Sequence, residues 1–334
     1  MLRRSRQITA IAGHAVEVMT GDPLFLVLLL CCGLGMLFFA SLPTFVSGEE
    51  LRLIRDQAMA WCWGGGCIMI LFAAELLIAG ELRRGNLALI MSEGVSPVSV
   101  IAGKWLGLAI LTLIFDFCLM IFLLWSTRLG RFGGEAQLIE WWVVGCYLTG
   151  MLLPLVGAAL YNYFWSGNFS RAASLLMPIV LLLFFIISCL KGSIRFSEFG
   201  GGVDWTSVWG ILSLLAGHLA FIAFVMVFAF LFSKGGLWAA GIVVFALGLF
   251  LKFILTSVLP DGYLQSLLLA VLPEWQIYWI SDLLAEHSGG GWKNFLSLAC
   301  FQMIQAAGLA VLYGSLCRII LQRIEVAGQY EQTR

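Results

Sequence analysis

Charged residues are scarce in this chain, and their scarcity limits the class of protein to which it can belong. Only 11% of the 334 residues are charged and 61% are hydrophobic, whereas soluble domains carry about 25% charged and about 45–50% apolar residues. A single globule cannot bury that much apolar surface. The mean hydropathy of +0.98 agrees, so the composition excludes a soluble domain and predicts an integral membrane protein. The formal net charge is zero, so we expect no nucleic-acid partner.

The residues that build catalytic and metal centres are also few. The three histidines, His14, His218 and His287, lack any H-x-x-x-H spacing, and the nine cysteines form no C-x-x-C pair. The cysteines are interpreted as free thiols in apolar surroundings, not as a metal site or a disulfide framework. The phosphate-binding pattern G-x-x-x-x-G-K-[ST] is missing, because Gly103-Lys104 is not followed by Ser or Thr. The chain is therefore predicted to be non-catalytic and to bind no cofactor.

Long apolar runs dominate the sequence instead. About 20 apolar residues are needed for a helix to cross a bilayer, and runs of this length predict an all-α protein with about eight transmembrane helices in a single domain, 1–334. The first run is too long for the apolar core of a cleaved signal peptide, so we expect it to be retained. A six-span count would need one pair to be re-entrant. The predicted spans are 23–42, 60–80, 105–125, 141–164, 172–190, 207–232, 237–259 and 295–317.

The basic residues predict the orientation of these spans. If the N-terminus lies inside, more Lys and Arg residues fall in the inner segments than in the outer ones. Cytoplasmic loops carry the excess of positive charge in membrane proteins. We therefore expect both termini in the cytoplasm and the protein in a plasma membrane, in bacteria the inner membrane.

An amphipathic helix is predicted ahead of the first span, over 1–22. Three arginines lie near its start, ahead of its apolar face, and Asp22-Pro23 is a helix-start signal for the span that follows. Such a helix should lie in the cytoplasmic interface of the lipid bilayer, with the arginines toward the head groups. Its apolar face, at helical spacing, consists of Ile8, Ile11, Ala12, Ala15, Val16 and Met19.

The outer segment 260–294 is more than a simple loop. It contains an apolar stretch, then Pro273, then a second apolar stretch, and neither is long enough to span. A broken apolar pair of this length predicts either a re-entrant hairpin buried against protein or an amphipathic surface helix.

The loop between the second and third spans, 81–104, is the most informative segment. Ser96 followed by Pro97 is a helix-start signal, a capping hydroxyl and then Pro at the first position. The pattern predicts a short helix over about 97–103, lying across the cytoplasmic mouth.

This loop contains, in this order, Glu81, Arg84-Gly85, Pro97-Val98-Ser99 and Gly103-Lys104. With this ordered set the chain resembles the ABC-2 type permeases, the membrane subunits of ABC exporters. Asn86 stands where that family usually has Thr, and the family commonly has six spans. The resemblance implies an N-terminal elbow helix and a short coupling helix that contacts a separate P-loop ATPase, which binds the ATP and Mg. It also implies a second permease copy or a paralogue. The residues implied in coupling are Glu81, Arg84, Gly85, Ser96, Pro97, Val98, Ser99 and Lys104, with Gly103 beside Lys104.

Four ionisable residues fall within predicted spans, where such groups are costly and are usually functional or paired. Glu75 could pair with Arg83 or Arg84, and Lys252 could reach the outer interface. Asp116 and His218 lie near the middle of their spans. Asp116 either faces a translocation path or forms a structural pair, with Lys252 or His218.

Two other classes remain as alternatives. An ion-coupled secondary transporter would explain Asp116 and His218, although no internal repeat is visible. A membrane-embedded enzyme would need a cluster of catalytic groups, which the few histidines do not provide. The apolar composition is compatible with lipids, hydrophobic drugs or peptides, or haem-like molecules as substrates.

Overall fold

The structure is a computed structural model that describes residues 2–42, 49–130, 140–190, 199–259, 262–272, 274–286 and 292–332. Within these ranges the chain is helical and contains no β-strand. Eight helical segments in the described ranges are long and apolar enough to cross a membrane, the number that the sequence predicts and one compatible with a multi-pass membrane protein. These segments are α2 (Pro23–Ser41), α3 (Glu50–Ala74) continued through a π-helical turn (Glu75–Ala79) and α4 (Gly80–Arg83), α6 (Pro97–Gly130), α7 (Trp141–Trp165), α8 (Phe169–Leu190), α9 (Ser207–Leu231), α10 (Lys234–Val258) and α13 (Trp292–Gln332).

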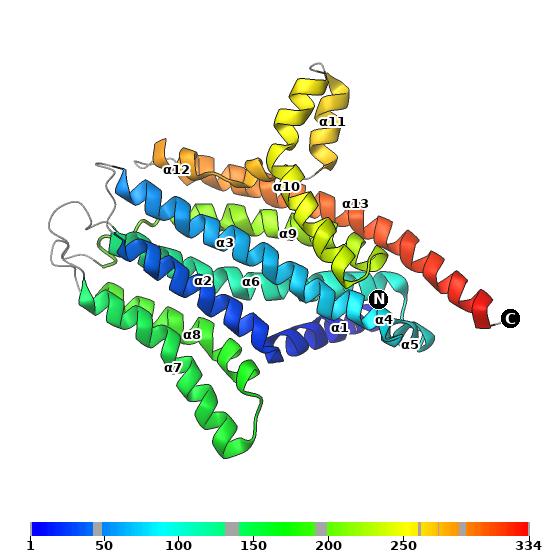
Figure 1. Ribbon diagram of the computed structural model, residues 1–334, viewed down its shortest axis with the longest axis horizontal. Helices are drawn as coiled ribbons and strands as arrows, with labels where there is room; N and C mark the ends of the chain where they lie inside the picture. The colour runs from blue at the N-terminus through cyan, green and yellow to red at the C-terminus, as the bar shows by residue number, and fades with distance from the viewer. Residues whose placement is uncertain are drawn as a thin grey trace.

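Most of these helices run side by side along the long axis of the molecule (Figure 1). The central helix is α9, which is apolar and buried nearly all round, as expected of a helix in the core of a bundle. Helices α3, α6 and α13 pack against it. Helices α7 and α8 pair on one flank, while α10 and α11 (Tyr263–Val271) project on the other (Figure 1).

Exposed aromatic side chains mark both ends of α7. Trp141 and Trp142 begin the helix, and Tyr163, Phe164 and Trp165 end it. From Trp142 to Tyr163 a helix rises about 31 Å at about 1.5 Å per residue, close to the bilayer hydrocarbon thickness of about 30 Å. Trp and Tyr prefer the two membrane–water interfaces, so α7 has the length and the end groups of a helix that crosses a bilayer.

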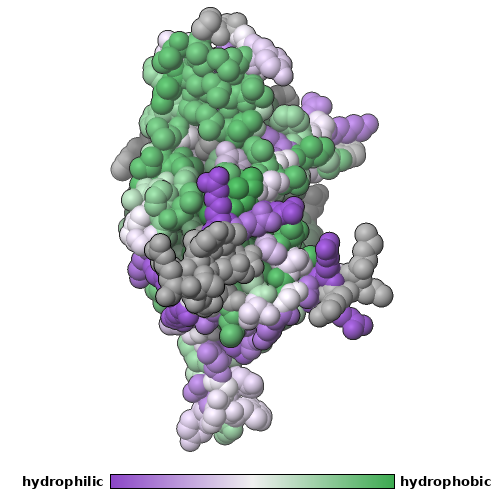
Figure 2. Space-filling view, turned by 90° about the vertical axis from the view of Figure 1, so that its right-hand side faces the viewer, coloured by the Kyte–Doolittle hydropathy of each residue, from purple (hydrophilic) through white to green (hydrophobic). Residues whose placement is uncertain are grey.

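Both ends of the chain lie at the same end of the bundle, together with α4 and α5 (Asn86–Ser92) (Figure 1). This is hereafter the terminal end, and the other is the opposite end. This arrangement is compatible with an even number of membrane-spanning helices. Viewed onto the terminal end, hydrophilic residues gather over its centre, and the flank at the top of the view is hydrophobic (Figure 2).

The predicted N-terminal helix is present as α1 (Leu2–Gly21) and packs along α6. Three residues of its predicted apolar face, Ala12, Ala15 and Met19, are buried, and so is Thr20 next to Met19. A methyl group added at Gly107 would lie 2.7 Å from Cβ of Ala15. Small residues on both helices therefore let the two backbones approach closely, as they do between membrane helices.

The predicted outer segment 260–294 is divided into two parts, as expected, with a bend of 66° between them. Trp275 and Tyr278 in the second part are buried against the bundle, whereas Tyr263 in the first part is exposed. The choice between a re-entrant hairpin and a surface helix stays a prediction. Pro273, the predicted break, lies outside the described residues. The second part comprises a 3-10 turn (Trp275–Tyr278) and α12 (Ser281–Glu286).

Candidate functional site

The loop between α3 and α6 folds back on itself around the short helix α5. Gly85, ahead of α5, has φ +73°, and Gly94, after it, has φ +79°. This left-handed conformation is one that glycine adopts without steric cost. The amide of Gly85 donates to the carbonyl of Leu82, and that of Gly94 donates to the carbonyl of Met91. The Gly85 of the predicted coupling motif is therefore the turn that separates α4 from α5.

Helix α6 begins where the sequence predicts, at Ser96-Pro97. The hydroxyl of Ser96 accepts the amide N–H of Ser99 at 3.2 Å and lies 2.8 Å from the Ser99 hydroxyl. Pro97 occupies the first helical position, where its missing N–H costs nothing. Both serines of the motif are thus used to start this helix.

The prediction that a short helix ends at about residue 103 is wrong. The helix that starts at Pro97 continues unbroken to Gly130. Gly103 does not stop it, because α1 packs there: a methyl group at Gly103 would lie 2.7 Å from Cβ of Ile11. The separate short helix of this loop is α5 instead, which lies between the motif residues Gly85 and Ser96.

Glu81 and Lys104, two residues of the motif, form an ion pair. Oε1 of Glu81 on α4 lies 2.5 Å from Nζ of Lys104 on α6. The Lys104 side chain is only 1% exposed and that of Glu81 is 14% exposed. The second carboxylate oxygen of Glu81 is buried without a hydrogen-bond partner among the described residues. Because a buried charge that loses its partner costs about 3–5 kcal/mol, this pair holds the loop firmly to α6.

The outer surface of α4 and α5 faces away from the bundle. Arg83 and Arg84 are exposed, and Leu89 is 65% exposed. Leu87, two residues before Leu89, is buried and anchors α5 to the bundle. Basic side chains and one large exposed apolar side chain are therefore presented together at the terminal end.

Glu75 has partners that the sequence does not predict. Its Oε2 accepts the indole N–H of Trp238 at 2.7 Å, and its Oε1 lies 3.1 Å from Nζ of Lys234. Both partners are on α10, whereas the predicted partners, Arg83 at the end of α4 and Arg84 just after it, are exposed. The reason is the π-helical turn that begins at Glu75, since a π turn changes the direction in which side chains leave the helix.

Asp116 and His218 form a buried pair between α6 and α9. Nδ1 of His218 lies 2.8 Å from Oδ2 of Asp116, and the side chains of His218 and Asp116 are 0% and 3% exposed. The ring of Trp63 stacks on the imidazole at 4.9 Å between centroids. Gly66 leaves room for that imidazole, because a methyl group there would overlap its ring. Of the two predicted partners of Asp116, His218 is the one found, and Lys252 is exposed on α10.

Sequence reasoning missed two buried ion pairs at the opposite end. Arg128 contacts Glu140 at 3.0 Å, and Arg55 contacts Asp204 at 3.2 Å. Arg128 also donates to the carbonyl of Ser188 at 2.8 Å. The first pair joins the consecutive spans α6 and α7, and the second joins α3 to the segment ahead of α9. An arginine at the end of one apolar run and an acid just before the next is the sequence signal for the Arg128 pair.

Comparisons of this chain with family models, with curated proteins and with solved structures give no match. The support for a resemblance to the ABC-2 type permeases is therefore limited to the residues of the segment between α3 and α6. Two of them, Glu81 and Lys104, meet in the buried ion pair, and Ser96 and Ser99 meet at the first turn of α6. Both contacts join the loop to a helix that runs the full length of the bundle.

Proposed function

We propose that this chain is the membrane-spanning permease subunit of an ATP-driven exporter of the ABC-2 type. The observation that carries the proposal is the buried Glu81–Lys104 pair. It joins α4, the end of the spanning segment that begins with α3, to α6, and so provides a rigid route from a contact next to α4 to a second spanning helix. The chain itself is non-catalytic, and ATP hydrolysis belongs to a partner.

The contact for this partner is the exposed surface of α4 and α5. Arg83, Arg84 and Leu89 give it a basic character with an apolar centre. Large exposed apolar side chains with charged neighbours are typical of sites for protein partners. Movement of a nucleotide-driven ATPase at α5 would pass through α4 and the Glu81–Lys104 pair to α6, and would tilt α6 against α9.

The exposed basic residues support a cytoplasmic location of the terminal end. At the opposite end Arg55 and Arg128 are buried in ion pairs, whereas Arg52 is partly exposed and Lys293 is exposed, so fewer exposed basic residues lie there than at the terminal end. The positive-inside rule therefore favours a position of α5 on the side where ATP is present. The described side chains that are exposed at the terminal end include Arg4, Arg6, Arg83, Arg84, Lys234, Arg318 and Arg323.

An ion-coupled secondary transporter is the second proposal, and the Asp116–His218 pair favours it. This pair is a titratable couple buried in the middle of the bundle, and proton-driven carriers use such groups. A secondary transporter would work without any ATPase. It leaves the exposed α5 and the anchored loop without a role, which is why the first proposal is preferred.

A matched pair of variants tests the first proposal. The full chain is purified from its own membranes in mild detergent, and a bound ATPase is identified by mass and by labelling with a photoreactive ATP. Leu89→Arg should abolish that association. Phe199→Arg is the control, since Phe199 is 59% exposed at the opposite end, and it should leave the association intact.

Two results would overturn the proposal. One is purification of a chain that transports substrate with no ATP-hydrolysing companion. The other is an ATPase that stays bound when Leu89 is replaced and is lost when Phe199 is replaced, because the docking surface would then lie at the wrong end.

A further inference from the structure

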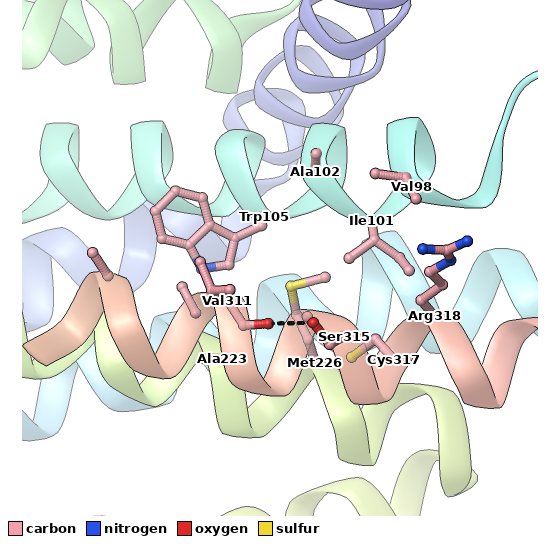
Figure 3. Close-up of a pocket in the computed structure, with 13 residues that line it drawn as sticks. Val98, Ile101, Ala102, Trp105, Ala223, Met226, Val311, Ser315, Cys317 and Arg318 are labelled. Carbon is pink, nitrogen blue, oxygen red and sulfur yellow. Dashed lines mark hydrogen bonds between the residues drawn. The ribbon is translucent and has the colours of Figure 1, made fainter. Parts of the chain in front are cut away.

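A groove opens between α6, α9 and α13 near the terminal end (Figure 3). Its volume is about 510 Å³, within the range of about 300–1,000 Å³ typical of small-molecule sites. Apolar side chains form its walls, among them Ile101 of α6 and Met226 of α9. It therefore suits a ligand that is mostly hydrocarbon.

The groove opens onto the apolar surface of the bundle. Val98 on one rim is 49% exposed and Val311 on the other is 72% exposed. Further along α13 the exposed side chains Leu312, Leu316 and Ile319 continue this surface. On a helix that faces a bilayer, exposed residues of this kind contact lipid chains, so lipid has direct access to the groove.

Two hydrogen-bond donor groups at this apolar groove have no acceptor among the described residues. The indole N–H of Trp105, which lines the groove, is buried and unpaired. The guanidinium of Arg318 is exposed at the same groove and points toward the first turn of α6, where Val98 lies (Figure 3). Pro97 has no N–H and the amide of Ser99 donates to Ser96, so the amide of Val98 is the one left in that turn, at a helix end that carries a positive partial charge. The apolar groove therefore has hydrogen-bond donors at two places: Arg318 and the start of α6 at one end, and the indole of Trp105 about two helical turns further along α6.

We propose that this groove binds one anionic phospholipid from the leaflet at the terminal end. The acyl chains lie along Ile101 and Met226, and the phosphate lies between Arg318 and the start of α6. The indole N–H of Trp105 then donates to an ester carbonyl deeper in the groove. The assignment to the cytoplasmic leaflet, which is rich in anionic lipid, rests on the orientation in the proposed function; the binding itself does not.

The competing ligands have the wrong chemistry for these walls. A soluble phosphate would satisfy Arg318 and leave the apolar groove to water. A zwitterionic lipid would bring its own cation next to the guanidinium. An anionic lipid satisfies both parts of the groove, and by contacting α6 and α13 together it would hold these two helices in one relative position.

Binding is measured by native mass spectrometry of the full chain in detergent, titrated with phosphatidylglycerol or phosphatidylcholine. We expect saturable binding of one phosphatidylglycerol and at least about tenfold weaker binding of phosphatidylcholine, the difference that one charge-assisted hydrogen bond provides. Arg318→Gln should weaken phosphatidylglycerol binding about tenfold. Arg323→Gln, an exposed arginine on the same helix outside the groove, should leave it unchanged. Trp105→Phe, which removes the N–H and keeps an aromatic ring, should weaken it about fivefold.

Substitutions at Gly314 and Gly308 distinguish a loss of binding caused by filling the groove from a loss caused by a damaged fold. A side chain added at Gly314 or at Gly308 meets no atom within 4 Å at its first carbon, and only Gly314 lines the groove. Gly314→Leu should abolish phosphatidylglycerol binding, while Gly308→Leu should retain it.

Three results would overturn the lipid proposal. The first is equal binding of the two lipids, and the second is full binding by Arg318→Gln or Gly314→Leu. The third is complete competition by inorganic phosphate at millimolar concentration, which would indicate a soluble-anion site. None of these measurements involves an ATPase, so the lipid proposal and the proposed function can fail separately.

Discussion

The carboxylate of Glu81 lies 2.5 Å from the ammonium group of Lys104, across the boundary between the α3–α6 loop and α6 itself. The two positions are 23 residues apart in the chain, and Gly85 and Gly94 make the turns that bring them together. The pair joins α4, the end of the helical segment that begins with α3, to α6. In the proposed function, movement of α5 is passed to α6 through α4 and this pair.

Removal of Lys104 should cost far more than removal of an exposed partner. Lys104→Met leaves Glu81 buried and unpaired, so the free energy of unfolding should fall by about 3–5 kcal/mol. The control is Arg171→Gln, which breaks the exposed Arg171–Glu17 pair and should cost less than about 1 kcal/mol. Thermal or denaturant unfolding in detergent measures both.

A double substitution distinguishes stability from coupling. Glu81→Gln together with Lys104→Met removes both charges, so most of the lost stability should return. Substrate-stimulated ATP hydrolysis by the assembled complex should remain low, because the link between loop and helix is still missing. Recovery of both properties together would show that the pair only stabilises the fold.

Replacement by alanine at two glycines of α3 should have different effects on the free energy of unfolding. A methyl group at Gly66 overlaps the His218 ring, while at Gly64 it meets nothing within 4 Å. Gly66→Ala should therefore lower the free energy of unfolding by about 1–3 kcal/mol, and Gly64→Ala should leave it unchanged or raise it by about 0.5–1 kcal/mol. If both variants unfold at the same temperature, the contact between Gly66 and His218 is not as described.

Asp116→Asn should leave transport at its wild-type rate, with unchanged protein level. Asn has the shape of Asp and can still accept a hydrogen bond from His218, so the buried pair keeps its geometry without its charge. Transport is measured in vesicles with the wild-type chain alongside. Loss of transport in a variant that is fully folded would assign Asp116 to the translocation step and would favour the ion-coupled alternative.

Labelling of introduced cysteines should place α5 in the cytoplasm. Cys31 and Cys300, the exposed cysteines among those described, are first replaced by Ser. A cysteine in place of Arg84 should then be protected in intact cells from a membrane-impermeant maleimide, and one in place of Glu286 should react. Both positions are exposed and lie at different ends of the bundle. The reverse labelling pattern would place the loop away from ATP and remove the basis of the proposed function.

Features that depend on local composition could be predicted from the sequence. Each span is a run of about 20 apolar residues, and the transfer of such a run into lipid is favourable whatever its neighbours are. The start of α6 is equally predictable, because Ser96 and Pro97 act within one turn. The apolar face of α1 follows from helical spacing alone, and its buried Ala12, Ala15 and Met19 confirm it.

The partners of Glu75 depend on which helices meet, and no local pattern encodes them. Glu75 and Arg83 belong to the same continuous helical segment. The Glu75 carboxylate nevertheless contacts Lys234 and Trp238 of α10. The π-helical turn at Glu75 and the packing of α10 select these partners.

Packing between helices also explains the length of α6 and the pairing of Asp116 with His218. The predicted short helix ends near Gly103, but in the fold Gly103 is the position where Ile11 of α1 packs on α6, and the helix passes through it. Asp116 has two predicted partners on different helices, and only the packing of α6 against α9 selects His218.

Hydropathy and capping act over one or a few turns, so the sequence by itself determined the spans and the start of α6. Ion pairs such as Glu81–Lys104 and glycine contacts such as that of Gly66 with His218 join residues far apart in the chain. Their partners therefore depend on how the helices pack together, and only the tertiary structure decided them.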